Sequence, residues 1–268
     1  MAAPELERRY EHAAFCVAAT GRYIAGMTRT YKKSFLWITL LGALAALQCG
    51  CNRAASSGDS KGAGRQSRYP ARWWQPVSKE GAPDWEIMPQ EAGPGEVILS
   101  KRQPDLGLLS NFAATPLEFR GQHFASLEGL WQSMMYPEGP DDPRATFPGL
   151  EWKYTRDQVA QMTAFEAKAA GDLGSENMKK MGIDWVTFQG KRMEYKPAEP
   201  GEHFRLIALA TREKVQQNPD VKAALLSTGD LRLKPDHHQE PGAPAAWHYF
   251  NILMEIRGEL QHEAAAGR

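Results

Sequence analysis

The sequence predicts an α+β fold: one compact, mainly helical domain with a small hairpin or sheet near its start. Two observations predict it. Short strand-like stretches occupy residues 96–100 and 116–124, and after residue 126 helix caps and a helical spacing of apolar residues take over. No internal repeat interrupts this order, so a single domain is expected over residues 96–262.

The segment before the first strand, residues 70–95, is rich in proline and tryptophan. Repeated proline disfavours a helix, so we expect an extended strap there. Trp73, Trp74 and Trp85 are expected to attach the strap to the domain.

The first strand is expected over residues 96–100, and a hairpin over residues 116–124 turns at Arg120-Gly121. Ser126 can cap a helix that begins directly after it, at Leu127. The sequence therefore leads from a hairpin straight into the first helix.

Capping boxes predict the next two helix starts. Thr155 and Thr163 are each followed three residues later by a glutamine or a glutamate. Further along, residues 204–215 carry apolar side chains at helical spacing.

Two more helices complete the expected domain. Asn218-Pro219 caps and opens the first of them, and Gly229 can close it. Residues 252–260 form a last amphipathic helix, and residues 263–268 are left as a tail.

Composition is that of an ordinary globular protein. The chain has 268 residues, of which 42% are hydrophobic and 24% are charged, so a sizeable core is expected. Lysine and arginine number 32, as do aspartate and glutamate, so the net charge is zero. Proteins that hold long nucleic acids by neutralising phosphates usually have a basic excess, so such a partner is not expected.

The N-terminal part predicts targeting rather than a folded unit. Lys32 and Lys33 precede an apolar run over residues 35–47, which is shorter than the about 20 residues of a membrane span. A short apolar run behind a positive flank is typical of a signal peptide. The alternative is a buried helix of the domain, but this run is apolar on every face and precedes a Gly/Ser-rich stretch that indicates a tether.

The apolar run ends at Gly50-Cys51, which resembles the lipobox of bacterial lipoproteins. This resemblance implies lipidation of Cys51 and a protein anchored to a membrane of the bacterial cell envelope, in the periplasm or on the outer surface. All three cysteines lie within residues 1–51, so no disulfide or cysteine-bound metal is expected in the domain. We therefore divide the chain into a signal or lipoprotein-like segment (1–51), a tether and strap (52–95), the domain (96–262) and the tail.

Glu128 is the leading candidate for a catalytic group. It lies in the first turn of its expected helix, where the helix dipole favours a carboxylate. Leu127, Leu130 and Trp131 surround it in the sequence and would remove water, which favours the neutral acid. A carboxyl group under opposed influences is a candidate general acid, base or cation stabiliser, although it could also be an ordinary first-turn glutamate.

Each of the other candidate site residues is weaker evidence when it is considered alone. Ser110 and Asn111 can bind a sugar or phosphate but are also common turn residues. Trp185 could stack on a base or belong to the core, and Asp230 could be catalytic or simply end a helix. The pair His237-His238, after Asp236, invites a metal site, but adjacent histidines beside prolines are usually solvated. No metal or cofactor is expected, and the sequence motifs of kinases, esterases and zinc proteases are missing.

Taken in order, several segments resemble the NADAR family. They are "ILS", "GLLSNF", "LEFRGQHFASLEGLWQ", "AFEAKAAG", "IDW", "REKVQQNPDVKAALLSTGD" and "ILMEIRGEL", within residues 97–261. The resemblance implies a compact, mainly helical domain. It also implies an N-glycosidase activity on ribosylated bases, either riboflavin intermediates or ADP-ribosylated guanine.

The resemblance also implies roles for individual residues. Glu128 takes the role of a carboxylate that stabilises positive charge at the ribose C1′, and Asp230 is a second catalytic candidate. Substrate-binding candidates are Ser110, Asn111, Phe112, Trp131, Gln132 and Trp185. The implied partner is a small-molecule nucleotide or ADP-ribosyl substrate.

The chain departs from the family pattern at several positions. Gly129 stands where the family has a histidine, and Met135 stands where it has a lysine that acts in catalysis in some members. Residues 196–202 look inserted, and Trp247 and Phe250 replace smaller residues before the last helix. Three interpretations remain open: an active N-glycosidase, a nucleotide or ADP-ribose-binding module without catalysis, and a structural protein whose pocket is filled.

Overall fold

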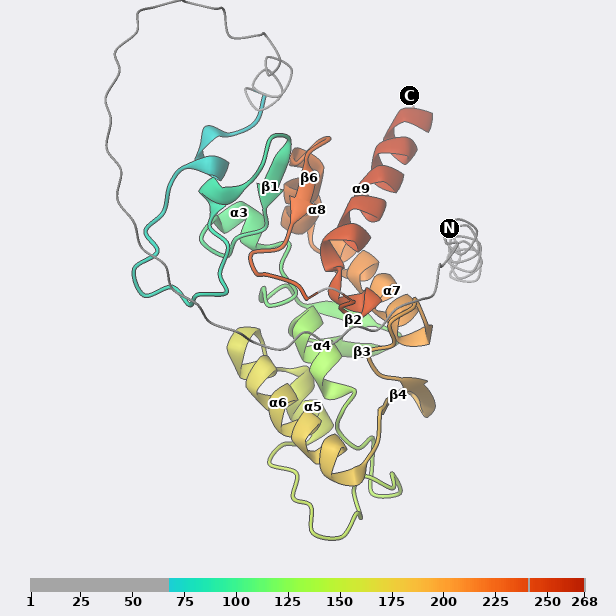
Figure 1. Ribbon diagram of the computed structural model, residues 1–268. Coiled ribbons are helices and arrows are strands. Elements are labelled where there is room, and N and C mark those ends of the chain that lie inside the picture. The colour runs from blue at the N-terminus through green and yellow to red at the C-terminus, as the bar shows by residue number, and fades with distance from the viewer. Residues whose placement is uncertain (1–67, 241, 268) are drawn as a thin grey trace, which may run out of the picture. The chain divides into compact units, whose positions relative to one another are not determined.

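The computed structural model describes residues 68–240 and 242–267 (Figure 1). The expectations for residues 1–51, including lipidation of Cys51, and for the tether lie outside these residues. Among the described residues, no helix is both long and apolar enough to span a membrane.

The predicted α+β class is confirmed, because helices dominate and the strands form only two-stranded sheets. The elements of the first half are η1 (Ala71–Trp74), η2 (Pro89–Glu91), β1 (Glu96–Ile98), α3 (Pro104–Gly107), β2 (Leu117–Phe119), β3 (Gln122–Phe124) and α4 (Leu127–Ser133). The second half comprises α5 (Arg156–Ala160), α6 (Ala164–Met181), β4 (Trp185–Phe188), β5 (Lys191–Glu194), α7 (Glu202–Gln217), α8 (Pro219–Ser227), β6 (Arg232–Lys234), η3 (Ala245–Trp247) and α9 (Tyr249–Ala266).

The predicted hairpin is present as β2 and β3, which pair in antiparallel register. Its turn is Arg120-Gly121, and both residues have left-handed backbone, with φ of 48° and 78°. Two successive left-handed residues match the right-handed twist of the flanking strands. A second hairpin, β4 with β5, turns in the same way at Gln189-Gly190.

The β1 strand does not pair with its neighbours in sequence. It lies parallel to β6, with Val97 opposite Leu233. Figure 1 shows these two strands side by side, near α3 and α8. This pairing joins the start of the domain to its last third.

The helix α4 lies at the centre of the described part of the chain, and every one of its residues is buried. It contacts α5, α6 and α7, and Figure 1 shows it between α6 and α7. Its start is capped as predicted, since the Ser126 hydroxyl accepts from the Gly129 amide at 2.9 Å and donates to the Met162 carbonyl at 2.9 Å.

Of the other helix caps predicted from the sequence, some form and some do not. Thr155 and Gln158 form the predicted capping box at the start of α5. The side chains of Thr163 and Asn218 make no capping bond, although α6 and α8 begin directly after them. The first amide of α6, that of Ala164, instead donates to the Phe112 carbonyl at 3.1 Å. At the other end of the chain, α9 extends to Ala266, so residues 263–266 continue the helix that was expected to end before them.

Two of the three tryptophans attach the strap by side-chain hydrogen bonds. Trp73 is buried and donates to Asp105 at 2.8 Å, and Trp74 donates to the Glu96 carbonyl at 2.9 Å. Trp85 is 46% exposed, and its ring lies 5.4 Å from Lys101 Nζ. Its neighbour Glu86 attaches the strap there, through a buried carboxylate that accepts two hydrogen bonds from Arg102.

Candidate active site

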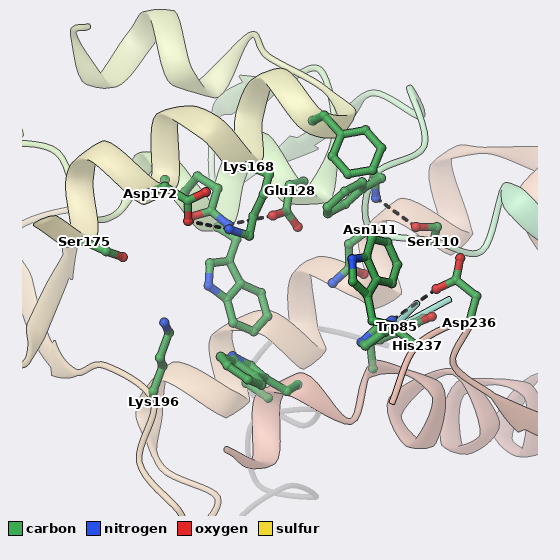
Figure 2. Close-up of a pocket in the computed structure, with 18 of the residues that line it drawn as sticks. Trp85, Ser110, Asn111, Glu128, Lys168, Asp172, Ser175, Lys196, Asp236 and His237 are labelled. Atoms are coloured by element: carbon green, nitrogen blue, oxygen red, sulfur yellow. Dashed lines mark hydrogen bonds and ion pairs between the residues drawn. The ribbon is translucent and has the colours of Figure 1, made fainter. Parts of the chain in front are cut away.

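One pocket with a volume of about 430 Å³ brings together segments that are far apart in the sequence. It is lined by the strap, the 110–112 loop, α4, α6, the end of β5 and the loop that leads into α9. Figure 2 shows the residues of its wall. Volumes of this order are typical of small-molecule sites.

Glu128 lies at this pocket and is only 6% exposed. The side-chain amide of Gln132, one helical turn later, donates to Glu128 Oε1 at 2.6 Å. Burial raises the pKa of Glu128 to about 7, and the Gln132 hydrogen bond and the charge of Lys168 oppose that rise. Two opposed influences on the pKa of Glu128 were expected from the sequence. The removal of water, which raises the pKa, outweighs the stabilisation of the charged form.

Neighbouring segments position the Glu128 backbone and its partner Gln132. The Glu128 amide donates to the Asn111 carbonyl at 3.0 Å, which ties the 110–112 loop to the start of α4. Gly171 of α6 faces Gln132, and a Cβ at this glycine would lie 1.8 Å from Gln132 Oε1. The absence of a side chain at residue 171 is therefore what gives Gln132 the room to reach Glu128.

Close packing also explains why residue 129 is a glycine. A Cβ at this position would lie 2.6 Å from the Met162 carbonyl oxygen and 2.9 Å from that of Ala160. A larger residue does not fit here without moving the backbone.

Aromatic side chains line the pocket on two sides. Phe112 packs edge-on against Phe165, with ring centroids 5.3 Å apart. On the other side the Trp131 indole donates to the Tyr195 hydroxyl at 3.1 Å. His203 is fully buried beneath Trp131 and Tyr195, and burial lowers its pKa to about 4, so it packs there as a neutral ring. Flat apolar walls of this kind suit a planar base.

The pocket also contains three lysines. Lys101 lies 5.4 Å from the Trp85 ring and 5.4 Å from the Phe165 ring. Lys168 forms an ion pair with Asp172 on α6. Lys196 directly follows Tyr195 and lies against its ring.

Asp236 and His237 line the pocket from the loop before α9. Their side chains are 3.1 Å apart, and the His237 ring stacks on Tyr249. Within residues 68–240 and 242–267, no group of three or more His, Cys, Asp or Glu side chains is placed to hold a metal ion.

Six of the eight residues expected from the sequence to catalyse or to bind substrate line this pocket. They are Ser110, Asn111, Phe112, Glu128, Trp131 and Gln132. They meet there because the 110–112 loop is hydrogen-bonded to the start of α4.

Trp185 and Asp230 lie elsewhere. Trp185 begins β4, and its ring is held between the guanidinium groups of Arg144 and Arg192, at 4.9 Å and 4.0 Å from the centroid. Asp230 accepts a hydrogen bond from the hydroxyl of Tyr69, which directly precedes the strap. Neither residue lines the pocket, so the structure does not place them with Glu128.

Several residues line the pocket that were not expected there from the sequence, among them Lys168, Tyr195, Lys196 and Trp85. For Lys168 a signal existed, since it precedes Gly171 and Gly174 on a predicted helix, and small residues one turn apart indicate close packing of two helices. The others reach the pocket through tertiary packing, with no sequence signal of their own.

Comparisons with known proteins provide one structural similarity. No family model matches the chain. No curated protein matches it either. Among solved structures, the chain is similar to the NMR structure of the E. coli protein YbiA, with 19% sequence identity and a TM-score of 0.40, over 63% of this chain and 86% of that chain. A similarity of this size assigns neither a family nor an activity.

Proposed function

We propose that this protein is an N-glycosidase-like hydrolase that cleaves the bond between a ribose and a base, in a substrate of the riboflavin-intermediate or ADP-ribosyl type. The observation that carries the proposal is the Glu128 carboxyl group, buried in a pocket walled by aromatic rings. A carboxyl group with a strongly raised pKa in a concave site is a candidate for catalysis.

The reaction requires a negative charge where this carboxyl group lies. As the C1′–N bond breaks, its electron pair stays with the leaving base, and positive charge develops at C1′. A Glu128 carboxylate beside C1′ stabilises that charge, and the stabilisation is larger because water is excluded. A water molecule then forms the new C1′–O bond and loses a proton, while the base gains one.

The walls of the pocket suit the two ends of such a substrate. Phe112 and Trp131 offer flat surfaces to a base. Asn111 and the Tyr195 hydroxyl offer polar groups to the sugar or to the edge of the base. These residues orient the bond that breaks relative to Glu128, and such orientation contributes much of the rate in many enzymes.

The test is release of free base from two substrates, a ribosylated amino-pyrimidine phosphate and ADP-ribosylated guanine. We expect Glu128→Gln to lower kcat by a factor on the order of 100 or more, as loss of an electrostatic group in a dry site commonly does. Glu166→Gln is the matched control, because Glu166 is also a first-turn glutamate but is exposed on α6, outside this pocket. Equal rates for wild type and Glu128→Gln would reject the assigned role.

The second candidate function is a nucleotide or ADP-ribose-binding module without catalysis. Met135 favours it, because this residue stands where the resembled family has a lysine, and its side chain is buried outside the pocket. The same assay separates the two functions. A wild-type protein that binds these ligands but releases no base supports the binding module.

We also propose that the chain is anchored to a membrane of the bacterial cell envelope by lipid on Cys51. The support is the sequence alone: the lysine flank, the short apolar run and Gly50 before Cys51. Metabolic labelling with a fatty acid tests it. Cys51→Ser should abolish the label, whereas label that persists in Cys51→Ser and disappears in Cys49→Ala would show that the cysteine is wrongly chosen.

A further inference from the structure

Lys196 differs from the other two lysines of the pocket in its charge environment. Lys168 is paired with Asp172, and Lys101 Nζ lies 3.6 Å from Glu86 Oε1. Among residues 68–240 and 242–267, no carboxylate lies within 4 Å of the Lys196 ammonium group. Within these residues Lys196 therefore forms no direct ion pair, and Asp172, which is paired with Lys168, acts on it only from a longer distance.

Two aromatic rings lie against the Lys196 ammonium group. The group lies 4.7 Å from the centroid of Tyr195 and 5.2 Å from that of Trp247. The side chain is half-buried. Burial and then the charge of Lys168 lower the pKa of Lys196, whereas the charge of Asp172 opposes this shift. Ring faces attract a cation but do not neutralise it, so the site retains its affinity for an anion.

The backbone holds Lys196 in an unfavourable conformation. Its φ is 59°, in the left-handed region that side chains other than glycine, asparagine and aspartate seldom occupy. Lys196 lies in the connection between β5 and α7. Strained residues of this kind concentrate at ligand-binding sites, where the surrounding fold maintains them.

The position of Lys196 in the pocket indicates which end of a ligand it meets. In Figure 2, Lys196 and Ser175 lie on one side, Trp85 and His237 lie on the other, and Glu128 lies between the two sides. The Ser175 hydroxyl donates to the Met135 sulfur at 3.3 Å, and sulfur is a weak acceptor. This hydroxyl can therefore turn to an anion beside Lys196.

We propose that Lys196, assisted by Ser175, is the residue that selects a phosphate group on the sugar end of the substrate. The phosphate would lie against Lys196 with C1′ at Glu128, so that the base extends toward Phe112 and Trp85. This inference rests on the proposed function for the identity of the sugar. The anion site itself depends only on the contacts of Lys196.

The test is calorimetric binding to the full chain of two ligand pairs, ribose 5-phosphate with ribose and AMP with adenosine. Wild type should prefer the phosphorylated member of each pair by about 10- to 100-fold, the range expected for a hydrogen bond to a charged group. Lys196→Ala and Lys196→Gln should remove most of this preference with little change for ribose and adenosine. Lys196→Arg keeps the charge and should retain part of the preference.

The matched control is Lys153→Gln. Lys153 also lies against the ring of the neighbouring tyrosine, 5.1 Å from the Tyr154 centroid, but outside the pocket. The proposal is overturned if wild type shows no phosphate preference, if the preference survives in Lys196→Gln, or if Lys153→Gln lowers it equally. Because binding requires no catalysis, a failure to release base would reject the N-glycosidase function and leave this result intact.

Discussion

At the scale of single residues, the charge state of Glu128 is set by a few neighbours. Burial raises its pKa to about 7, so at neutral pH the carboxyl group is close to half ionised. Lys168 lowers this pKa and Asp172, its ion-pair partner, raises it. Two side chains of one turn of α6 thus tune the group that the proposed reaction depends on.

Lys168→Met should raise the pKa of Glu128 further, because Asp172 then acts on it without its counter-ion. If the reaction uses the carboxylate, the rise of kcat/KM with pH should move to a midpoint above about 7. Asp172→Asn should move this midpoint to lower pH, because Asp172 raises the pKa of Glu128. Lys179→Met, an exposed lysine near the end of the same helix, should leave it unchanged. A common midpoint for all three variants would contradict the assigned electrostatics.

Glu128 should also make stability depend on pH. A carboxyl group whose pKa rises from 4.5 to about 7 on folding binds its proton more tightly in the folded state. The free energy of unfolding should therefore fall between pH 4.5 and pH 7, by on the order of 3 kcal/mol from this group. Glu128→Gln removes this pH-dependent component. The free energy of unfolding of the variant, relative to that of wild type, should therefore rise as the pH increases through that range. Urea unfolding at several pH values measures it. A difference that is constant with pH would show that Glu128 is not buried as described.

At the scale of elements, glycines determine how closely the helices pack. Gly129 places α4 against the carbonyl groups at the end of α5. Gly171 places α6 against α4, and Gly174 places it against Met135 and Tyr136, which follow α4. Close approach at these points gives the pocket its inner wall and gives Gln132 its route to Glu128. The strap acts from outside, where Glu86 and Arg102 hold it near the pocket edge.

Replacing Gly129 or Gly258 by alanine should change the free energy of unfolding in opposite directions. In Gly129→Ala the new methyl group meets backbone carbonyls at 2.6 Å and 2.9 Å, which cannot move without moving the helix, so a loss of about 1–3 kcal/mol is expected. In Gly258→Ala, within α9, nothing lies within 4 Å, and alanine should stabilise by about 0.5–1 kcal/mol. Chemical denaturation measures both. Equal effects of the two changes would mean that Gly129 is not a packing glycine.

At the scale of the whole molecule, the strap belongs to the fold although it precedes the first strand. Trp73 is 1% exposed, and the Tyr69 hydroxyl donates to Asp230, near the end of α8. The backbone of Ile87 also donates to the Asp236 carbonyl at 2.8 Å, in the loop that lines the pocket. The first and last parts of the described chain therefore hold each other in place.

A chain that starts at Arg68 should unfold cooperatively, with the same midpoint in the presence and absence of reductant, because no cysteine follows Cys51. A chain that starts at Glu96 lacks Trp73 and leaves Arg102 without Glu86. It should lose at least the about 3–5 kcal/mol expected for removal of a buried tryptophan, or aggregate. Thermal unfolding of the two chains makes the comparison. A strap-free chain with an unchanged midpoint would contradict this account.

The sequence by itself determined the features that depend on local chemistry. The turn at Arg120-Gly121, the Ser126 cap and the α+β class need only nearby residues, so their signals can be found in short windows. The position of Glu128 in a capped first turn among apolar neighbours is of the same kind.

Only the tertiary structure decided which distant groups share the pocket. Tyr195, Lys196 and Trp85 join Glu128 because α4 contacts α6 and α7 and because the strap pairs with the loop before α9. Trp185 and Asp230 are placed outside it by the two arginines and the Tyr69 hydroxyl that hold them. Such contacts join residues tens to more than a hundred positions apart, and they depend on how helices and loops pack. Neither local propensity nor spacing along the chain contains that information.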